Sequence, residues 1–244
     1  MIYILIGLSL LFVAIGLIVT ENNAKYLLAG YNTMSDEDRK KVDINAYIPY
    51  FRKFHVFLGS SLFVLGCAFT YLINETAGGI FLTVYPLLAY IYVVIAGRKH
   101  WKAVSFKGNK ITLVILVGSL LFVVWLMGRG LKEDTLSFES DTVVFNGSYG
   151  ETLSSSDIQS IELVDQLPQI TLRTGGFGLG TVRKGYFRTK DKETVKLILN
   201  GDQKPIILFT KRDGKKIYYS ARSTLNEDIM DEIQQTLPNK VLTQ

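Results

Sequence analysis

Four long apolar stretches in the first 130 residues constrain the fold of this chain more than any other feature. They cover residues 2–20, 56–73, 77–96 and 111–127, and none contains Asp, Glu, Lys, Arg or His. Each is close to the ~20 apolar residues that a helix needs to cross ~30 Å of hydrocarbon. Four such stretches in succession predict a membrane α-helical bundle with four transmembrane helices.

The charges divide the chain into two unlike halves. Residues 1–130 hold 12 Lys and Arg against 6 Asp and Glu, whereas residues 131–244 hold 15 against 16. The basic balance of the whole chain therefore comes from short loops beside membrane spans, which topology alone explains, and a nucleic-acid partner is not expected. We predict a four-span domain over residues 1–130 and one globular domain over residues 131–244.

The basic loops predict the orientation of the spans. The loops 21–53 and 97–110 together carry 11 Lys and Arg, whereas the turn 74–76 carries none. Positive residues favour the cytoplasmic side, so both basic loops are expected there. With four spans, this places both termini outside the cytoplasm. The interpretation is a multi-pass protein of the cell membrane with an extracytoplasmic C-terminal domain.

Chemistry-bearing side chains are sparse. No ionisable residue lies in any predicted span, which disfavours a proton relay, an ion site or a charged substrate path. Cys67 is the single cysteine, and neither His55 nor His100 has a partner at metal-ligand spacing. We therefore expect no cofactor, no metal and no catalytic residues.

The loop after the first span carries a specific motif. It reads Leu-Ala-Gly-Tyr-Asn-Thr-Met-Ser and ends at Ser35, and residues 36–38 are all acidic. A hydroxyl followed by acids is typical of a helix N-terminus, so Ser35 is predicted to cap a short helix. This order of span, motif, charged helix and further spans resembles a family of small bacterial membrane proteins of unknown function, over about residues 1–100. The resemblance implies no activity. The motif is expected either to pack under the bundle or to bind a partner.

The second half has the pattern of a small β domain. Seven or eight short segments alternate apolar and polar residues, and Asn146-Gly147, Asn200-Gly201 and Asp213-Gly214 are predicted hairpin turns. The sequence Thr224–Glu227 then reads as a capping box that opens an amphipathic helix, which Pro238 ends. The apolar face of this helix is predicted to hold Leu225, Ile229, Ile233 and Leu237.

An antiparallel barrel closed by one C-terminal helix is the layout of pleckstrin-homology domains. The segments 158–168, 173–180, 184–188 and 204–208 resemble a bacterial pleckstrin-homology-like domain, and the resemblance covers about residues 131–240. It implies a small β-rich barrel closed by the C-terminal helix. It implies no ligand.

A basic cluster surrounds the glycine run 175–180. We single out five cations as candidate contacts for an anionic lipid or an acidic partner: Arg173, Arg183, Lys184, Arg188 and Lys190. The alternative is a solvated rim that nearby acids balance. A nucleotide loop is disfavoured, because no helix is expected to open after the glycines. The glycines are instead expected to give backbone freedom in a long loop or to allow two strands to approach closely.

The predicted function is that of a non-catalytic integral membrane protein that displays an interaction domain for envelope assembly, sensing, or lipid or protein binding. Its expected partners are membrane lipids and another membrane or envelope protein, and a homo-oligomer is left open. The alternative is a subunit of a transport or channel complex, which the uncharged spans disfavour. A membrane enzyme is a third alternative, but it would need convergent polar groups at one membrane face, and the sequence supplies only scattered Ser, Thr and Lys.

Overall fold

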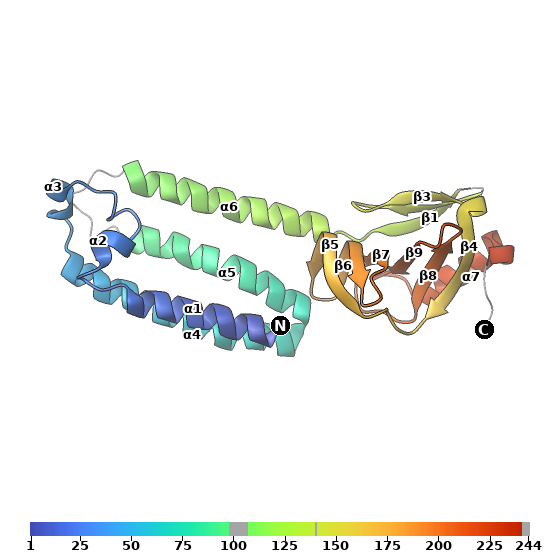
Figure 1. The fold of residues 1–244 in the computed structure, drawn as a ribbon, viewed down its shortest axis with the longest axis horizontal. Coiled ribbons are helices and arrows are strands. Elements are labelled where there is room, and N and C mark those ends of the chain that lie inside the picture. The colour runs from blue at the N-terminus through green and yellow to red at the C-terminus, as the bar shows by residue number, and fades with distance from the viewer. Residues whose placement is uncertain (98–106, 140, 241–244) are drawn as a thin grey trace. The chain divides into compact units, whose positions relative to one another are not determined.

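A computed structural model describes residues 1–97, 107–139 and 141–240 of the chain (Figure 1). It divides into two compact units, Met1–Trp125 and Leu126–Gln244, and each is described by itself. The helices of the first unit, of which the last crosses the boundary, are α1 (Ile2–Ile18), α2 (Ala24–Leu27), α3 (Asp36–Arg39), α4 (Ile44–Ala68) with its π-helical continuation η1 (Phe69–Ile73), α5 (Glu75–Ala96) and α6 (Lys107–Leu131).

Within the described residues, three helices are long and apolar enough to cross a membrane: Ile44–Ile73, Glu75–Ala96 and Lys110–Leu131. The fourth, α1, is also apolar but has 17 residues. The membrane-like helices predicted from the sequence are thus confirmed. One boundary was wrong, because the second helix begins at Ile44, where the Asp43 carboxylate accepts a hydrogen bond from the Ala46 amide at 3.0 Å. That helix therefore includes Arg52, Lys53 and His55.

Small residues let α1 pack closely along α4. A side chain at Gly59 would collide with Val13, one at Gly66 would collide with Leu5, and Gly16 faces the β-carbon of His55. Because the contacts run in opposite directions along the two helices, α1 and α4 are antiparallel. Glycines spaced seven apart form this seam, which the sequence pattern alone did not reveal.

The predicted cap at Ser35 is confirmed, since its hydroxyl accepts a hydrogen bond from the Asp38 amide at 3.2 Å. Nearby, Tyr31 and Met34 pack against a small buried cluster that includes Val19 and Ile48. The motif that ends at Ser35 therefore has a structural role within this unit. Most of the second predicted basic loop, residues 98–106 with His100, lies outside the described residues.

The second unit contains nine strands among its described residues. They are β1 (Thr135–Glu139), β2 (Thr142–Asn146), β3 (Glu151–Ser154), β4 (Ile158–Val164), β5 (Ile170–Leu179), β6 (Val182–Thr189), β7 (Thr194–Leu199), β8 (Ile206–Lys211) and β9 (Lys216–Ser220). A short 3-10 turn, η3 (Ser155–Asp157), precedes β4, and the helix α7 (Asn226–Thr236) and the 3-10 turn η4 (Pro238–Lys240) follow the strands.

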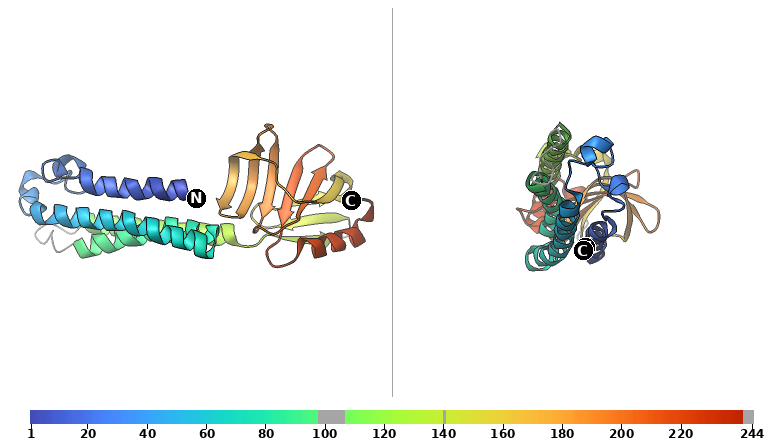
Figure 2. Two further views of the ribbon diagram at one scale, coloured as in Figure 1. Left: turned by 90° about the horizontal axis from the view of Figure 1, so that it is seen from below. Right: turned by 90° about the vertical axis from the view of Figure 1, so that its left-hand side faces the viewer.

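These strands form two sheets rather than the single barrel that was predicted. One has the order β1-β2-β3, and the other has the order β4-β8-β9-β7-β6-β5 (Figure 2). Five flat strand spacings would separate the edge strands β4 and β5 by about 24 Å. The chain that joins Val164 to Ile170 spans at most roughly 20 Å, so the larger sheet has to curl. No closed barrel forms in the described part of the chain, because β4 pairs only with β8 and β5 pairs only with β6.

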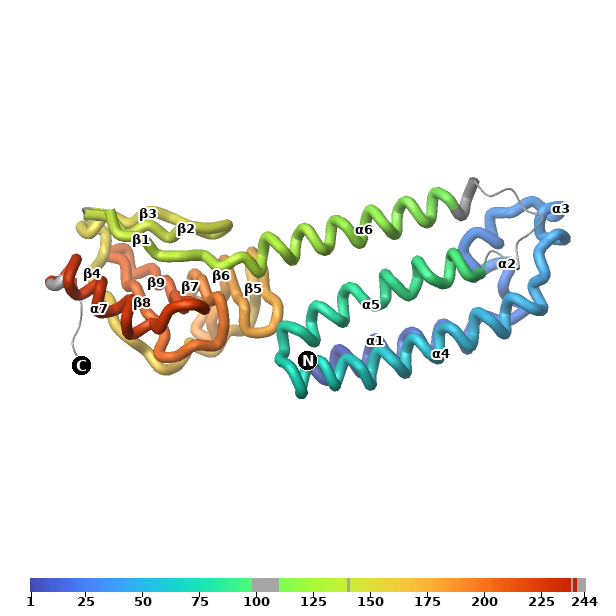
Figure 3. The backbone as a smooth tube through the Cα atoms, turned by 180° about the vertical axis from the view of Figure 1, so that it is seen from behind, coloured from blue at the N-terminus to red at the C-terminus, as the bar shows by residue number. Residues whose placement is uncertain are grey.

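The larger sheet has a core on each face. One core lies between this sheet, the smaller sheet and α7, and it includes Phe145, Phe209 and Ile233. Figure 3 shows α7 and the smaller sheet beside the larger one. The opposite, concave face buries a second cluster, and Leu167 of the β4–β5 connection packs against it. The members of this second cluster are Phe187, Val195, Leu197, Leu199, Ile206, Leu208 and Tyr218.

The predicted turns had mixed outcomes. Asn146-Gly147 and Asp213-Gly214 lie in turns between paired antiparallel strands, as predicted. Asn200-Gly201 does not close a hairpin, because β7 pairs in parallel with β9 rather than with the next strand, β8. The Asn200 side chain is instead fully buried and bonded to the backbone of Asp134.

The capping box predicted at Thr224–Glu227 was wrong. Helix α7 begins at Asn226, and its N-cap residue Leu225 is 56% exposed. The Asn226 side chain is buried and bonds to the Ala221 amide and the Pro205 carbonyl instead. The rest of the predicted apolar face, Ile229, Ile233 and Leu237, is buried as expected.

Candidate functional site

The glycine run lies in a tightly paired hairpin rather than in a long loop. Gly176 pairs with Gly185 across β5 and β6, and both have a positive φ, of 131° and 117°. A β-carbon on Gly176 would overlap the Lys184 carbonyl, so only glycine fits here. The interpretation of the glycines as a close approach of two strands is confirmed. The pairing is antiparallel and leads into a turn, not into a helix.

The structure does not bring the five candidate cations together. Arg173 pairs with Phe187 and Arg183 pairs with Leu199, which places both arginines on the concave face of the larger sheet. Arg188 is exposed on the opposite face, and Lys190 is exposed beyond the end of β6.

Lys184 cannot serve as a surface contact, because its side chain is 0% exposed. Its ammonium lies 2.8 Å from a carboxylate oxygen of Asp134, whose side chain is 3% exposed, and it also donates to the Lys132 carbonyl. Burial lowers the pKa of Lys184, although the hydrogen bond and the charge of Asp134 oppose that change. The inclusion of Lys184 among the candidate contacts was therefore wrong, because burial and an ion partner remove it from solvent.

Lys184 belongs to a network that holds the segment between α6 and β1. The Asn200 amide group exchanges two hydrogen bonds of 2.8 Å with the backbone of Asp134, and the Tyr219 hydroxyl donates to the Asp134 carbonyl at 3.2 Å. The Arg222 guanidinium donates to the Leu131 carbonyl at 3.1 Å and to the Asn200 carbonyl at 2.9 Å. We call this network, with Lys184 and Asp134, the junction.

Glu133 adds an ionised group to the junction. One of its carboxylate oxygens accepts from the Arg222 amide at 2.7 Å and from the Ser223 amide at 3.2 Å. Burial of the carboxylate would raise the pKa of Glu133, but these hydrogen bonds outweigh burial and hold the pKa below its usual value. The backbone turn after β9 is thereby tied to the residues that follow α6.

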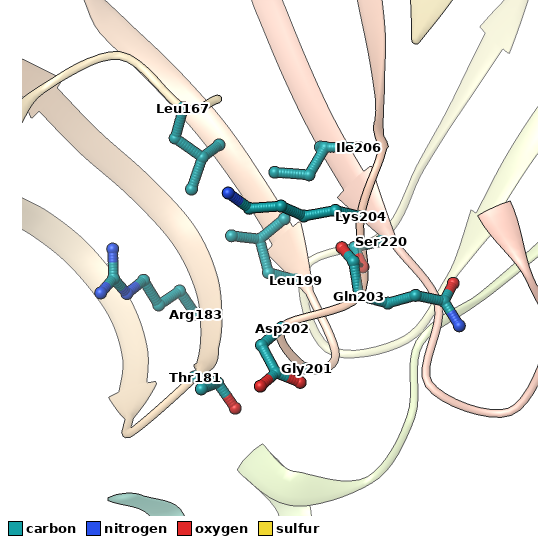
Figure 4. A pocket seen from close by; sticks show the side chains of 10 residues that line it. All are labelled: Leu167, Thr181, Arg183, Leu199, Gly201, Asp202, Gln203, Lys204, Ile206 and Ser220. Carbon is teal, nitrogen blue, oxygen red and sulfur yellow. Dashed lines mark hydrogen bonds between the residues drawn. The ribbon is translucent and has the colours of Figure 1, made fainter. Parts of the chain in front are cut away.

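A small pocket lies on the concave face beside the junction. Its volume is about 170 Å³, and its floor contains Leu167, Leu199 and Ile206. Figure 4 shows the Lys204 side chain extending over this floor toward Leu167. The other residues of its lining are Thr181, Arg183, Gly201, Asp202, Gln203 and Ser220.

The pocket and the junction are built from neighbouring residues on the same strand ends. On β6, Arg183 lines the pocket and the next residue, Lys184, belongs to the junction. At the end of β7, Leu199 lines the pocket and the next residue, Asn200, belongs to the junction. The sequence pattern identified Arg183, which lies on β6. It missed Lys204, which lies on the connection between β7 and β8. Asn200-Gly201 was predicted as a hairpin turn, but Asn200 belongs to the junction and Gly201 lines the pocket.

The arrangement offers ion pairing and apolar contact rather than covalent chemistry. Two cations, one acid and an apolar floor can hold a small amphiphilic anion. Among the described residues, no group of three His, Cys, Asp or Glu side chains could hold a metal ion.

Comparison with known proteins finds a match only for the first 100 residues, before α6. Residues 6–100 match the model of a family described as a domain of unknown function (DUF3784). This match agrees with the resemblance of about residues 1–100 to a membrane family without a known activity. No family of pleckstrin-homology-like domains matches the β region. No curated protein and no solved structure matches the chain.

Proposed function

We propose that the protein is a non-catalytic integral membrane protein whose β domain binds an anionic group at the membrane surface. The ligand is the phosphate of a phospholipid headgroup. Arg183 and Lys204 supply the opposing charge, and the apolar floor of the pocket contacts the glycerol end of the lipid. Arg173, which lies on the same face, adds to the local positive charge.

The position of the pocket carries this proposal. The last candidate span ends at Leu131, and Lys184 bonds to the carbonyl of the next residue, Lys132. Arg183 is adjacent to Lys184, so its backbone lies on the order of 10 Å from the end of the span. The interfacial layer of a bilayer extends several Å beyond the hydrocarbon on each side. This distance supports the proposal, because it brings the pocket within reach of lipid headgroups.

The energetics favour a weak, charge-dependent contact. A basic residue near an anionic membrane surface contributes ~1 kcal/mol, and the contribution falls with salt. Two cations therefore give roughly a 10- to 30-fold preference for anionic over zwitterionic lipid. Asp202 lines the same pocket and reduces this preference.

Two finer features of the fold belong to the same proposal. A curled sheet, a second sheet and one C-terminal helix support a pleckstrin-homology-like domain, although the strands form no closed barrel. The close packing of α1 on α4 supports α1 as a fourth span, because a helix seated along a span lies at the same depth. Seventeen residues of helix extend over about 25 Å, which nearly crosses the hydrocarbon.

The charge of the loops supports an extracytoplasmic β domain in the cell membrane. We would replace Cys67, place a cysteine at the exposed Ser148 and label intact cells with an impermeant thiol reagent. Labelling in intact cells is expected. Protection that persists until the cells are lysed would contradict the assignment and would place the pocket on the cytoplasmic leaflet.

The binding proposal is tested with purified full-length protein in a neutral detergent. Short-chain phosphatidylglycerol, short-chain phosphatidylcholine and inorganic phosphate would be titrated, and bound lipid would be counted by native mass spectrometry. We expect saturable binding of phosphatidylglycerol to the unchanged protein. The double variant Arg183→Gln with Lys204→Gln should weaken this binding by roughly 10-fold or more. Equal binding of both lipids would contradict the proposal, and equal competition by phosphate would identify a soluble anion as the ligand.

One observation favours the alternative, a subunit of a transport or channel complex. None of the apolar window of the span Lys110–Leu131 is buried inside the structure. That surface suits another membrane helix as well as it suits lipid. Chemical cross-linking in native membranes, followed by mass determination of the products, distinguishes a helix of another protein from lipid on this surface. A cross-linked product that contains a second protein would favour the complex.

A further inference from the structure

We propose that the junction fastens the last turn of α6 to the β domain, so that the end of the candidate span and the sheet move as one body. The junction would position the β domain relative to the end of α6 whether or not the pocket binds a lipid. A β domain on a free linker would move independently of the end of α6. The contacts of the junction restrict that movement.

The chain between the helix and the first strand has no slack. Only Lys132, Glu133 and Asp134 separate the end of α6 from β1. The Leu131 and Lys132 carbonyls accept from Arg222 and Lys184, and Asp134 uses both its amide and its carbonyl. A flexible linker would instead be rich in Gly or Ser, with its backbone groups open to water.

The end of the helix also fits a specific aromatic side chain. Gly130 is buried, and a β-carbon there would overlap the ring of Phe177. Phe177 follows Gly176, whose positive φ marks the close approach of β5 to β6. Phe177 is the pairing partner of Lys184 across β5 and β6, so the two side chains that hold the helix end come from one register position of the hairpin.

The ion pair of the junction fixes the arrangement of the chain after α6 more than it stabilises the fold. Asp134 and Lys184 are both buried, and the second carboxylate oxygen of Asp134 has no hydrogen-bond partner in the described structure. Buried pairs recover their desolvation cost incompletely, and some of them fix one arrangement among several of similar energy. Here the pair defines which residue after α6 meets β6.

Hydrogen exchange of the Asp134 amide tests the junction in the full-length protein, held in lipid nanodiscs. That amide donates to the Asn200 side chain at 2.8 Å, so its exchange reports opening of the junction. We expect exchange slowed by on the order of 100-fold or more relative to an unstructured peptide. Exchange at the unstructured rate would overturn the inference.

Two glycines of α6 provide a matched pair of variants. Gly130→Leu should raise the exchange of the Asp134 amide at least tenfold, because the new side chain displaces Phe177. Gly128→Leu should leave it unchanged, because no heavy atom lies within 4 Å of a β-carbon there. Adding Phe177→Ala to Gly130→Leu should restore slow exchange by making room for the leucine. Equal effects of the two leucines, or no recovery in the double variant, would overturn the fit of the helix end against Phe177.

Discussion

The two faces of strand β6 use neighbouring cations in opposite ways. On one face Lys184 is buried, paired with Asp134 and bonded to the chain that leaves α6. On the other face Arg183 is exposed at the rim of a pocket with an apolar floor. A basic cluster in a sequence is therefore not one site. The alternation of a strand separates a structural cation from a candidate ligand contact within a single peptide bond.

The largest loss of stability is expected when a charge enters the core between the larger sheet and α7, on the same face of β6 as Lys184. Ile233→Asp places a charge on the buried side of α7, where Ile233 is 0% exposed. We expect a loss of several kcal/mol and an unfolded β domain, because no partner can neutralise the new carboxylate. Circular dichroism and a thermal melt of residues 131–244 would show it. The unchanged fragment, which we expect to melt cooperatively, is the control, and Glu232→Asp on the exposed side should leave the melt unchanged.

The ion pair of the buried face gives the next largest effect. Lys184→Met leaves Asp134 buried without its partner and should cost about 3–5 kcal/mol. The double variant Lys184→Met with Asp134→Leu should recover most of that loss, because no unpaired charge remains. Urea unfolding of the four proteins in this cycle measures the coupling. A double variant as unstable as the single one would show that the pair itself supplies net stability.

Substitutions at the pocket on the concave face should change lipid binding rather than stability. Arg183→Gln with Lys204→Gln should weaken binding of an anionic short-chain lipid by roughly 10-fold or more, at ~1 kcal/mol per charge, and should leave the unfolding free energy nearly unchanged. Arg188→Gln, on the opposite face of β6, is the matched control and should bind normally. Equal losses from both variants would mean that overall charge, rather than the pocket, determines binding.

The smallest expected effect concerns pH. The folded pKa of Glu133 lies below its usual value, so its ionisation stabilises the fold above the unfolded pKa. That contribution should fall as the pH drops below about 4.5 and through the folded pKa. Glu133→Gln should flatten this part of the stability curve of the β domain. An unchanged slope between pH 5 and pH 3, measured by urea unfolding, would contradict the role given to the hydrogen bonds from Arg222 and Ser223.

Features that depend on local pattern could be predicted from the sequence. Long apolar runs, the Ser35 cap, the turn at Asn146-Gly147 and the apolar side of α7 each need only neighbouring residues. The junction could not be predicted, because Lys184 and Asp134 are fifty residues apart and Asn200 looks like an ordinary turn residue. The parallel pairing of β7 with β9 had no local signal either. Lys204 was missed because its role depends on how the larger sheet curls.

Arg183 is proposed to contact the lipid, whereas Lys184 holds the residues that follow α6 against the sheet. Thermal unfolding of full-length Arg183→Met and Lys184→Met, each with and without short-chain phosphatidylglycerol, tests this assignment most directly. We expect Arg183→Met to keep the melting temperature of the unchanged protein but to be stabilised less by the same lipid concentration. Lys184→Met should melt on the order of 10 °C or more lower without lipid and still be stabilised by the lipid. The assignment would be wrong if Arg183→Met lowered the melting temperature and responded normally to lipid, while Lys184→Met kept its melting temperature and lost the response.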